Sequence, residues 1–156
     1  MNRALAIGAV AVCAAASAGV GLWLSRPAVS TRIDAADQAL VAEGRGVYEK
    51  SCASCHGRNL EGQPNWRERL PNGRLPAPPH DPSGHTWHHP DRQLFDLTKN
   101  GLASVAPGYQ SDMPAFKDRL SDREIRAALA YIKSTWPPEI RARQAQTSEA
   151  DERAQR

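Results

Sequence analysis

The chain has 156 residues, of which 40% are hydrophobic, 24% charged and only 6% aromatic, and its formal net charge is +3. This length suits one small domain with extensions, and so few large apolar side chains would fill its core poorly without a non-protein group at the centre. Acidic and basic residues are mixed along the chain, with no run of like charge and no basic stripe among aromatic residues, so nothing in the sequence supports nucleic-acid binding.

The first predicted element is an apolar segment from Ala4 to Leu24 that contains no charged residue. A helix of this length extends about 30 Å, the thickness of the hydrocarbon core of a bilayer. Residues 1–25 are therefore expected to be a membrane anchor or a signal peptide, since Ala16-Ser17-Ala18 also fits a cleavage site. Cleavage there would leave an apolar amino terminus, which favours the uncleaved transmembrane helix. In both interpretations, the rest of the chain is exported across the membrane.

The second predicted element is a helix that follows a linker at residues 26–34. It is expected to begin at Asp34 or Asp37 and to end at Ser51, because apolar residues recur along it at spacings of three and four. Gly44 lies inside this helix, where glycine costs about 1 kcal/mol relative to alanine. A close crossing by another helix would explain it.

The sequence CASCH occupies residues 52–56, directly after this helix. The thiols of Cys52 and Cys55 can form thioethers with two vinyl groups on one edge of a porphyrin, while His56 becomes an axial ligand of the iron; this is the c-type haem attachment signature. A thioredoxin-like redox pair would need a βαβ pattern, and a zinc site would need a second ligand pair from a loop. We therefore expect one covalently attached haem c with its iron.

The region from Gly57 to Pro114 is rich in proline and glycine and is expected to be mostly loop. One short helix interrupts it, capped by Asp91 and stopped at Asn100-Gly101. Met113 is expected to be the sixth iron ligand, because a thioether favours reduced iron and raises the reduction potential of an electron carrier. A core methionine packed on the haem edge, and ligation by a loop histidine, are the alternatives.

The loop before the short helix is unusually rich in histidine. It contains His80, His85, His88 and His89. Neutral imidazoles suit copper, so copper binding is one interpretation. The favoured interpretation is a cover over one haem edge, in which Trp66 or Trp87 donates its indole N–H to a haem propionate.

The last predicted helix has the clearest signals. Ser121 and Glu124 have capping-box spacing, and Pro137-Pro138 prevents the helix from continuing. Its apolar face comprises Ile125, Ala128, Leu129, Ile132 and Trp136. After Ile140 the chain is polar, and residues 139–156 are expected to be a polar tail that is a frayed helix or disordered.

With these residues in place, the chain resembles the class I cytochrome c family over roughly residues 35–137. The order of helix, CASCH, loop with one middle helix, methionine followed by proline, and capped last helix is that of the family. In such proteins a glycine and an aromatic residue of the first helix pack across the last helix, and Gly44, Tyr48 and Tyr131 match these positions. The resemblance implies an all-α, cytochrome c-like domain, placed here at residues 35–138, around one haem.

The family also commonly has a proline after the haem motif whose carbonyl orients the ligand imidazole. Pro64, Pro71, Pro76 and Pro78 all compete for that place. The sequence alone leaves the choice among them open.

The predicted function is electron transfer by a monohaem c-type cytochrome that exchanges single electrons with donor and acceptor redox proteins. It is not expected to be an enzyme or to take a small-molecule substrate. The expected location is the bacterial inner membrane with the haem domain facing the periplasm, or the periplasm itself if the amino terminus is cleaved. The alternative is a haem subunit or domain of a dehydrogenase or oxidase, or a haem sensor with a displaceable sixth ligand.

Overall fold

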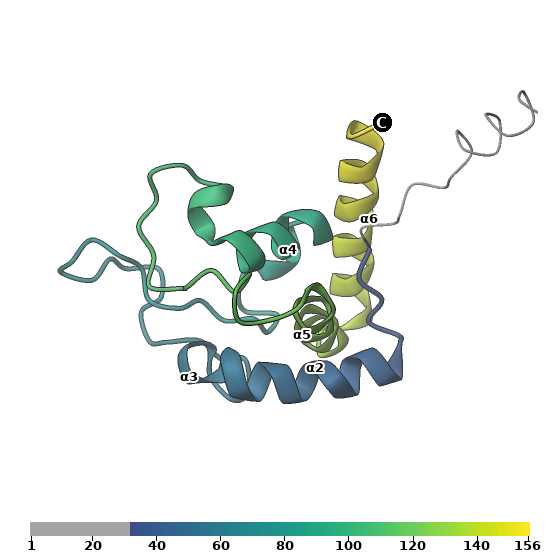
Figure 1. Cartoon of the computed structure of the whole chain (residues 1–156), viewed down its shortest axis with the longest axis horizontal. Coiled ribbons are helices and arrows are strands. Elements are labelled where there is room, and N and C mark those ends of the chain that lie inside the picture. Colours follow the sequence, from purple (N-terminus) through teal and green to yellow (C-terminus); the bar gives the residue numbers. More distant parts are fainter. Residues whose placement is uncertain (1–31) are drawn as a thin grey trace, which may run out of the picture. The chain divides into compact units, whose positions relative to one another are not determined.

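The computed structural model describes residues 32–156, so the predicted anchor or signal peptide at residues 1–25 lies outside the described residues. The described part is built of helices and loops without a strand (Figure 1), which confirms the all-α class. Its helices are α2 (Gln38–Ser51), α3 (Ala53–His56), α4 (Asp91–Asn100), α5 (Asp122–Ser134) and α6 (Pro138–Ala154), with 3₁₀ turns η1 (Thr86–His88) and η2 (Leu102–Ser104). Among residues 32–156, no helix combines the length and the apolar character needed to cross a bilayer.

Helix α2 begins after Asp37, one of the two predicted starting points. The Asp37 carboxylate accepts hydrogen bonds from the backbone N–H groups of Ala39 and Leu40, both at 3.0 Å. These are two of the donors that the first turn of a helix leaves without a partner. Asp34 lies outside the helix, where its side chain accepts from the N–H of Ala36 at 2.8 Å.

Helix α2 packs across α5 (Figure 1), and Gly44 lies at the crossing. A Cβ atom built on Gly44 would lie 1.8 Å from the carbonyl oxygen of Ala127, so the two backbones touch where any side chain would separate them. One turn further on, Tyr48 is fully buried and its ring centroid lies 5.4 Å from that of Tyr131. The close crossing predicted for Gly44, and its aromatic partners, are confirmed.

Helix α4 has the predicted extent, but Asp91 does not cap it. Asp91 is the first helical residue, and its buried carboxylate instead accepts from Lys133 Nζ at 2.6 and 2.7 Å and from the backbone N–H of Ile33 at 2.7 Å. A buried carboxylate is stable only with such partners, and the pairing with Lys133 takes Asp91 out of the capping role. At the other end, Gly101 follows the helix with φ at +85°, as expected of a glycine stop.

Helix α5 has the predicted capping box. The Glu124 N–H donates to Ser121 Oγ at 3.3 Å, and the Ser121 N–H donates to Glu124 Oε2 at 2.8 Å. Its apolar face is buried, with Ile125 fully inaccessible and Ile132 3% exposed. The helix ends at Ser134, before the two prolines, as predicted.

The polar segment after Ile140 forms most of helix α6, so the expectation of a frayed or disordered tail is wrong. Pro138 supplies the first turn, where its missing N–H costs nothing. Gln144 is fully buried and donates from Nε2 to Asp91 Oδ1 at 2.7 Å, and Ser148 accepts from the N–H of Asp91 at 3.0 Å. Polar contacts therefore hold α6 against the start of α4, where an apolar stripe would normally do so.

An excursion of the chain at residues 64–76 projects from the helices as the blue-green loop in Figure 1. Its base is closed by a pair of hydrogen bonds: the Gln63 N–H donates to the carbonyl oxygen of Ala77, and the Ala77 N–H donates to Gln63 Oε1, both at 2.9 Å. Away from the base, Arg74 forms an exposed ion pair with Asp112. The excursion therefore leaves and rejoins the domain at one point, and besides the ion pair its Trp66 stacks on His85 with ring centroids 5.5 Å apart.

Candidate haem-binding site

The two cysteines of the CASCH motif lie where α2 gives way to the single turn α3. Cys52 terminates α2 and is partly buried, whereas Cys55 on α3 is exposed, and neither forms a disulfide. The pKa of the Cys52 thiol is raised to about 11, mainly because the thiol is buried and to a smaller extent because Cys55 lies nearby. Just beyond the motif, the Tyr48 hydroxyl donates to the carbonyl oxygen of Gly57 at 2.8 Å, which ties the end of α3 to α2.

The imidazole of His56 is held in the form that a metal ligand requires. The ring is buried, and its Nδ1 lies 2.8 Å from the carbonyl oxygen of Pro78. A carbonyl only accepts hydrogen bonds, so Nδ1 carries the proton and Nε2 is left with a free lone pair. Burial lowers the pKa of His56, while the hydrogen bond to Pro78 opposes that shift. Of the four prolines that the sequence left open, Pro78 therefore orients the imidazole.

The four loop histidines occupy different surroundings. His80 stacks on His56, His85 stacks on Trp66, and His88 stacks on Trp87. His89 meets His85 edge to face, with ring centroids 5.5 Å apart. Across residues 32–156, no group of three or more histidine, cysteine or acidic side chains is arranged to hold a metal ion, so the structure gives the copper interpretation no site.

Met113 lies in the segment between η2 and α5, with its backbone N–H donating to Ser111 Oγ at 3.0 Å. Its side chain is partly buried and packs against the same apolar cluster that Cys52 and Trp87 contact. Met113 and Cys52 thus both border the apolar core of the domain.

Trp87 provides a test of whether the site suits a haem. Its indole Nε1 is buried and has no hydrogen-bond partner within the described part of the chain. A buried donor without a partner is costly, so such atoms usually mark the place of a missing acceptor. A haem propionate is an acceptor of the right kind. Between the two tryptophans predicted for this role, the structure favours Trp87. The two cysteines outside any disulfide, the His56 imidazole with its lone pair on Nε2, and this donor together fit a haem c.

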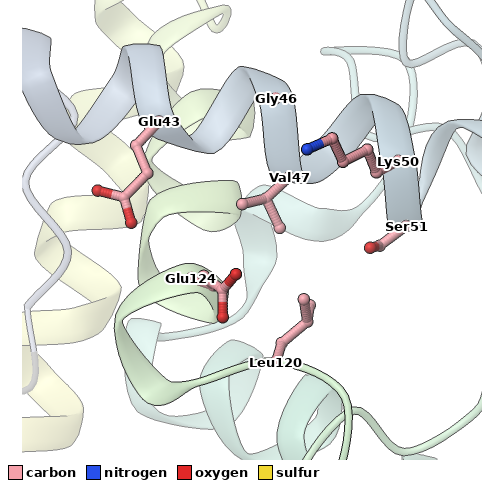
Figure 2. A pocket seen from close by; sticks show the side chains of 7 residues that line it. All are labelled: Glu43, Gly46, Val47, Lys50, Ser51, Leu120 and Glu124. Carbon is pink, nitrogen blue, oxygen red and sulfur yellow. The ribbon is translucent and has the colours of Figure 1, made fainter.

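An open pocket lies between the second half of α2 and the start of α5 (Figure 2). Val47 and Leu120 form its apolar part, while Glu43, Lys50 and Glu124 surround it with charges of both signs. Neither the cysteines of the motif nor His56 line it, so the pocket lies outside the candidate site.

Comparison with known proteins decides the family. The sequence profile of the family described as "Cytochrome C oxidase, cbb3-type, subunit III" matches residues 39–132. The chain belongs to this family. Membership of this c-type cytochrome family confirms the predicted resemblance, and the cofactor is covalently attached haem c with its iron.

The curated relatives of this chain include oxidase subunits and a small cytochrome. The chain is 32% identical over 100 residues to the Cbb3-type cytochrome c oxidase subunit CcoP of Azospirillum sp. (strain B510), covering 63% of this chain and 29% of the relative. For CcoP of Azospirillum brasilense the identity is 31% over 97 residues, or 62% and 28% of the two chains. Cytochrome c-555 of Prosthecochloris aestuarii is 26% identical over 102 residues, 62% of this chain and 88% of the relative.

The chain therefore spans less than a third of the CcoP subunits it matches, and most of the cytochrome c-555. No solved structure gives a significant match. These relatives support a c-type cytochrome that carries electrons, without indicating a catalytic activity of its own.

Proposed function

We propose that Cys52 and Cys55 attach the porphyrin through thioethers and that His56 and Met113 are the axial ligands of its iron. The hydrogen bond from His56 Nδ1 to Pro78 carries this assignment, because it leaves Nε2 as a free electron-pair donor directly after two cysteines outside any disulfide. Met113 supports the sixth position, since it is the only methionine besides Met1 and lies partly buried against the apolar core.

In this proposal the haem iron, when bound, takes up and releases single electrons. The chain holds that group in place: the thioethers fix one edge, and the Pro78 carbonyl fixes the direction and tautomer of the His56 ring. The Trp87 indole donates to a propionate and offsets part of its negative charge. With both axial positions taken by protein side chains, small molecules find no open coordination site, and the domain transfers electrons without transforming a substrate.

The proposed role is a membrane-anchored or periplasmic carrier that exchanges electrons with donor and acceptor redox proteins. The uncharged segment from Ala4 to Leu24 supports the anchor in the inner membrane, with the haem domain on the periplasmic side. The family match and the CcoP relatives favour a second candidate, a haem subunit within an oxidase complex. Gentle extraction from native membranes separates the two: a subunit migrates with oxidase activity, whereas a carrier migrates alone.

The variant Met113→Ala tests the ligand assignment in haem-loaded protein. We expect it to lose the sulfur-to-iron charge-transfer band and to have a lower reduction potential, because the thioether stabilises ferrous iron. A spectrum and potential identical to those of the wild type would refute Met113 as a ligand. Tight carbon monoxide binding by the reduced wild type would instead support a sensor with a displaceable sixth ligand.

The double variant Cys52→Ala, Cys55→Ala tests the attachment. After denaturation and acid extraction, the wild type should retain its pigment on the polypeptide, whereas the double variant should lose it. Pigment that stays bound in the double variant would contradict the assignment of both cysteines.

A further inference from the structure

The imidazole of His80 lies face to face with that of His56. The two ring centroids are 3.9 Å apart and the ring planes are inclined by 22°. His80 comes two residues after Pro78, whose carbonyl oxygen accepts from His56 Nδ1. The tripeptide Pro78-Pro79-His80 therefore contacts the proposed ligand twice, once at its edge and once on its face.

The two contacts restrain the His56 ring in different ways. In an imidazole, the axis that runs through Nε2 and the ring centre leaves the ring between Cγ and Nδ1. A hydrogen bond at Nδ1 fixes the ring's direction and tautomer, and because its acceptor lies to one side of that axis, it restrains rotation about the axis at one point only. A flat ring stacked on the face opposes that rotation directly, because turning His56 would drive its edge into His80.

His80 is itself fixed firmly enough to act as such a surface. Its backbone N–H donates to the carbonyl oxygen of Leu60 at 2.8 Å, and its own carbonyl accepts from the indole Nε1 of Trp136 at 2.7 Å. A hydrogen bond of 2.8 Å joins its Nδ1 to the hydroxyl of Thr86, a buried residue. Both the backbone and the ring of His80 are therefore held by residues outside the haem motif.

We propose that His80 is a positioning residue that sets the rotation of the His56 ring about its Nε2 axis. The inference rests on the proposed function, since it requires His56 to be an iron ligand. The plane of an axial imidazole decides how the unpaired electron of low-spin ferric haem is shared among the four pyrroles. The proton shifts of the four haem ring methyl groups report that distribution and so report the angle of the ring.

The experiment compares these methyl shifts by proton NMR in the oxidised, haem-loaded wild type and its variants. His80→Leu removes the flat surface, and we expect the order or the spread of the four shifts to change. His80→Phe restores a flat ring without the Thr86 hydrogen bond, and its pattern should return toward that of the wild type. His85→Leu is the matched control: His85 is an exposed histidine of the same loop that stacks on Trp66, so the pattern should not change.

Unchanged methyl shifts in His80→Leu would overturn the inference. So would a His80→Phe pattern that matches His80→Leu, because the effect would then come from packing volume and not from a stacked ring. If His80→Leu yields no folded haem protein, His80→Met decides: it fills a similar volume with a flexible side chain that has no ring, and methyl shifts identical to the wild type would overturn the proposal.

The same spectra distinguish failure of the inference from failure of the proposed function. Wild-type protein without covalent haem, or without the strongly shifted ring protons of an axial His56, would remove the ligand assignment and the inference with it. A wild type that shows both, together with variants that leave the methyl shifts unchanged, would remove the role of His80 alone.

Discussion

The crossing of α2 and α5 allows a sharp comparison between two glycines of one helix. In Gly44→Ala the new Cβ would lie 1.8 Å from the carbonyl oxygen and 2.3 Å from the carbonyl carbon of Ala127, both backbone atoms that no rotamer change can move. Contacts between non-bonded carbon atoms need about 3.5 Å, so the helices must separate by more than 1 Å. Gly46, half a turn away, has no atom within 4 Å of the corresponding position.

The substitutions Gly44→Ala and Gly46→Ala should change the free energy of unfolding in opposite directions. Forcing extra volume into a packed interface costs about 1–3 kcal/mol, and the crossing lies at the upper end because backbone meets backbone. Replacing glycine by alanine inside a helix otherwise stabilises the folded state by about 1 kcal/mol. Gly44→Ala should therefore lower the free energy of unfolding by about 2 kcal/mol, whereas Gly46→Ala, whose methyl group enters the pocket of Figure 2, should raise it by up to about 1 kcal/mol.

The assay is urea unfolding of the haem-loaded proteins, followed by helical circular dichroism and analysed by linear extrapolation. The difference between the two variants, about 3 kcal/mol, is well above the error of the method. If Gly44→Ala were as stable as Gly46→Ala, the backbones would not be in contact at Gly44, and the argument from the crossing would be refuted.

Two further predictions concern the buried ion pair and the proposed propionate donor. Lys133→Met leaves the Asp91 carboxylate buried without its cation, so it should lower the free energy of unfolding in urea by about 3–5 kcal/mol. Adding Asp91→Asn should recover part of this loss. Equal stability of the single and double variants would contradict the pairing. Trp87→Phe keeps the ring but removes the N–H, so the haem propionate regains its full charge, ferric iron is stabilised and the midpoint potential falls. Redox titration checks this, with Trp66→Phe as the control that should not shift.

The elements with local sequence signals were predictable. The carboxylate of Asp37, the capping box of Ser121 and the glycine stop at Gly101 each act within a few residues, so the ends of α2, α4 and α5 follow from short-range chemistry. Gly44 was informative for a related reason, because a glycine inside a helix is unfavourable unless something packs closely against it.

The features that were missed depend on contacts between distant segments. Helix α6 carries no apolar stripe, and the burial of Gln144 is understandable only once Asp91 and Lys133 are known to lie beneath it. Asp91 was expected as a cap, because its pairing with a lysine 42 positions away leaves no local pattern. For the same reason, Pro78 could not be chosen from four prolines and His80 gave no sign of its stacking on His56, although each was visible as a residue type.

Because the base of the excursion at residues 64–76 is closed, the length of this loop should not affect the position of Pro78, which orients the His56 ring. Because Gln63 and Ala77 bind each other, Pro78 starts from the same position whatever lies between them. Doubling the length of a flexible loop costs only about 0.6 kcal/mol in closure entropy, and the exposed pair of Arg74 with Asp112 contributes at most about 1 kcal/mol. The stretch between Trp66 and Arg74 is thus the place where this cytochrome can gain or lose residues, or accept an engineered insertion, without disturbing the imidazole of His56.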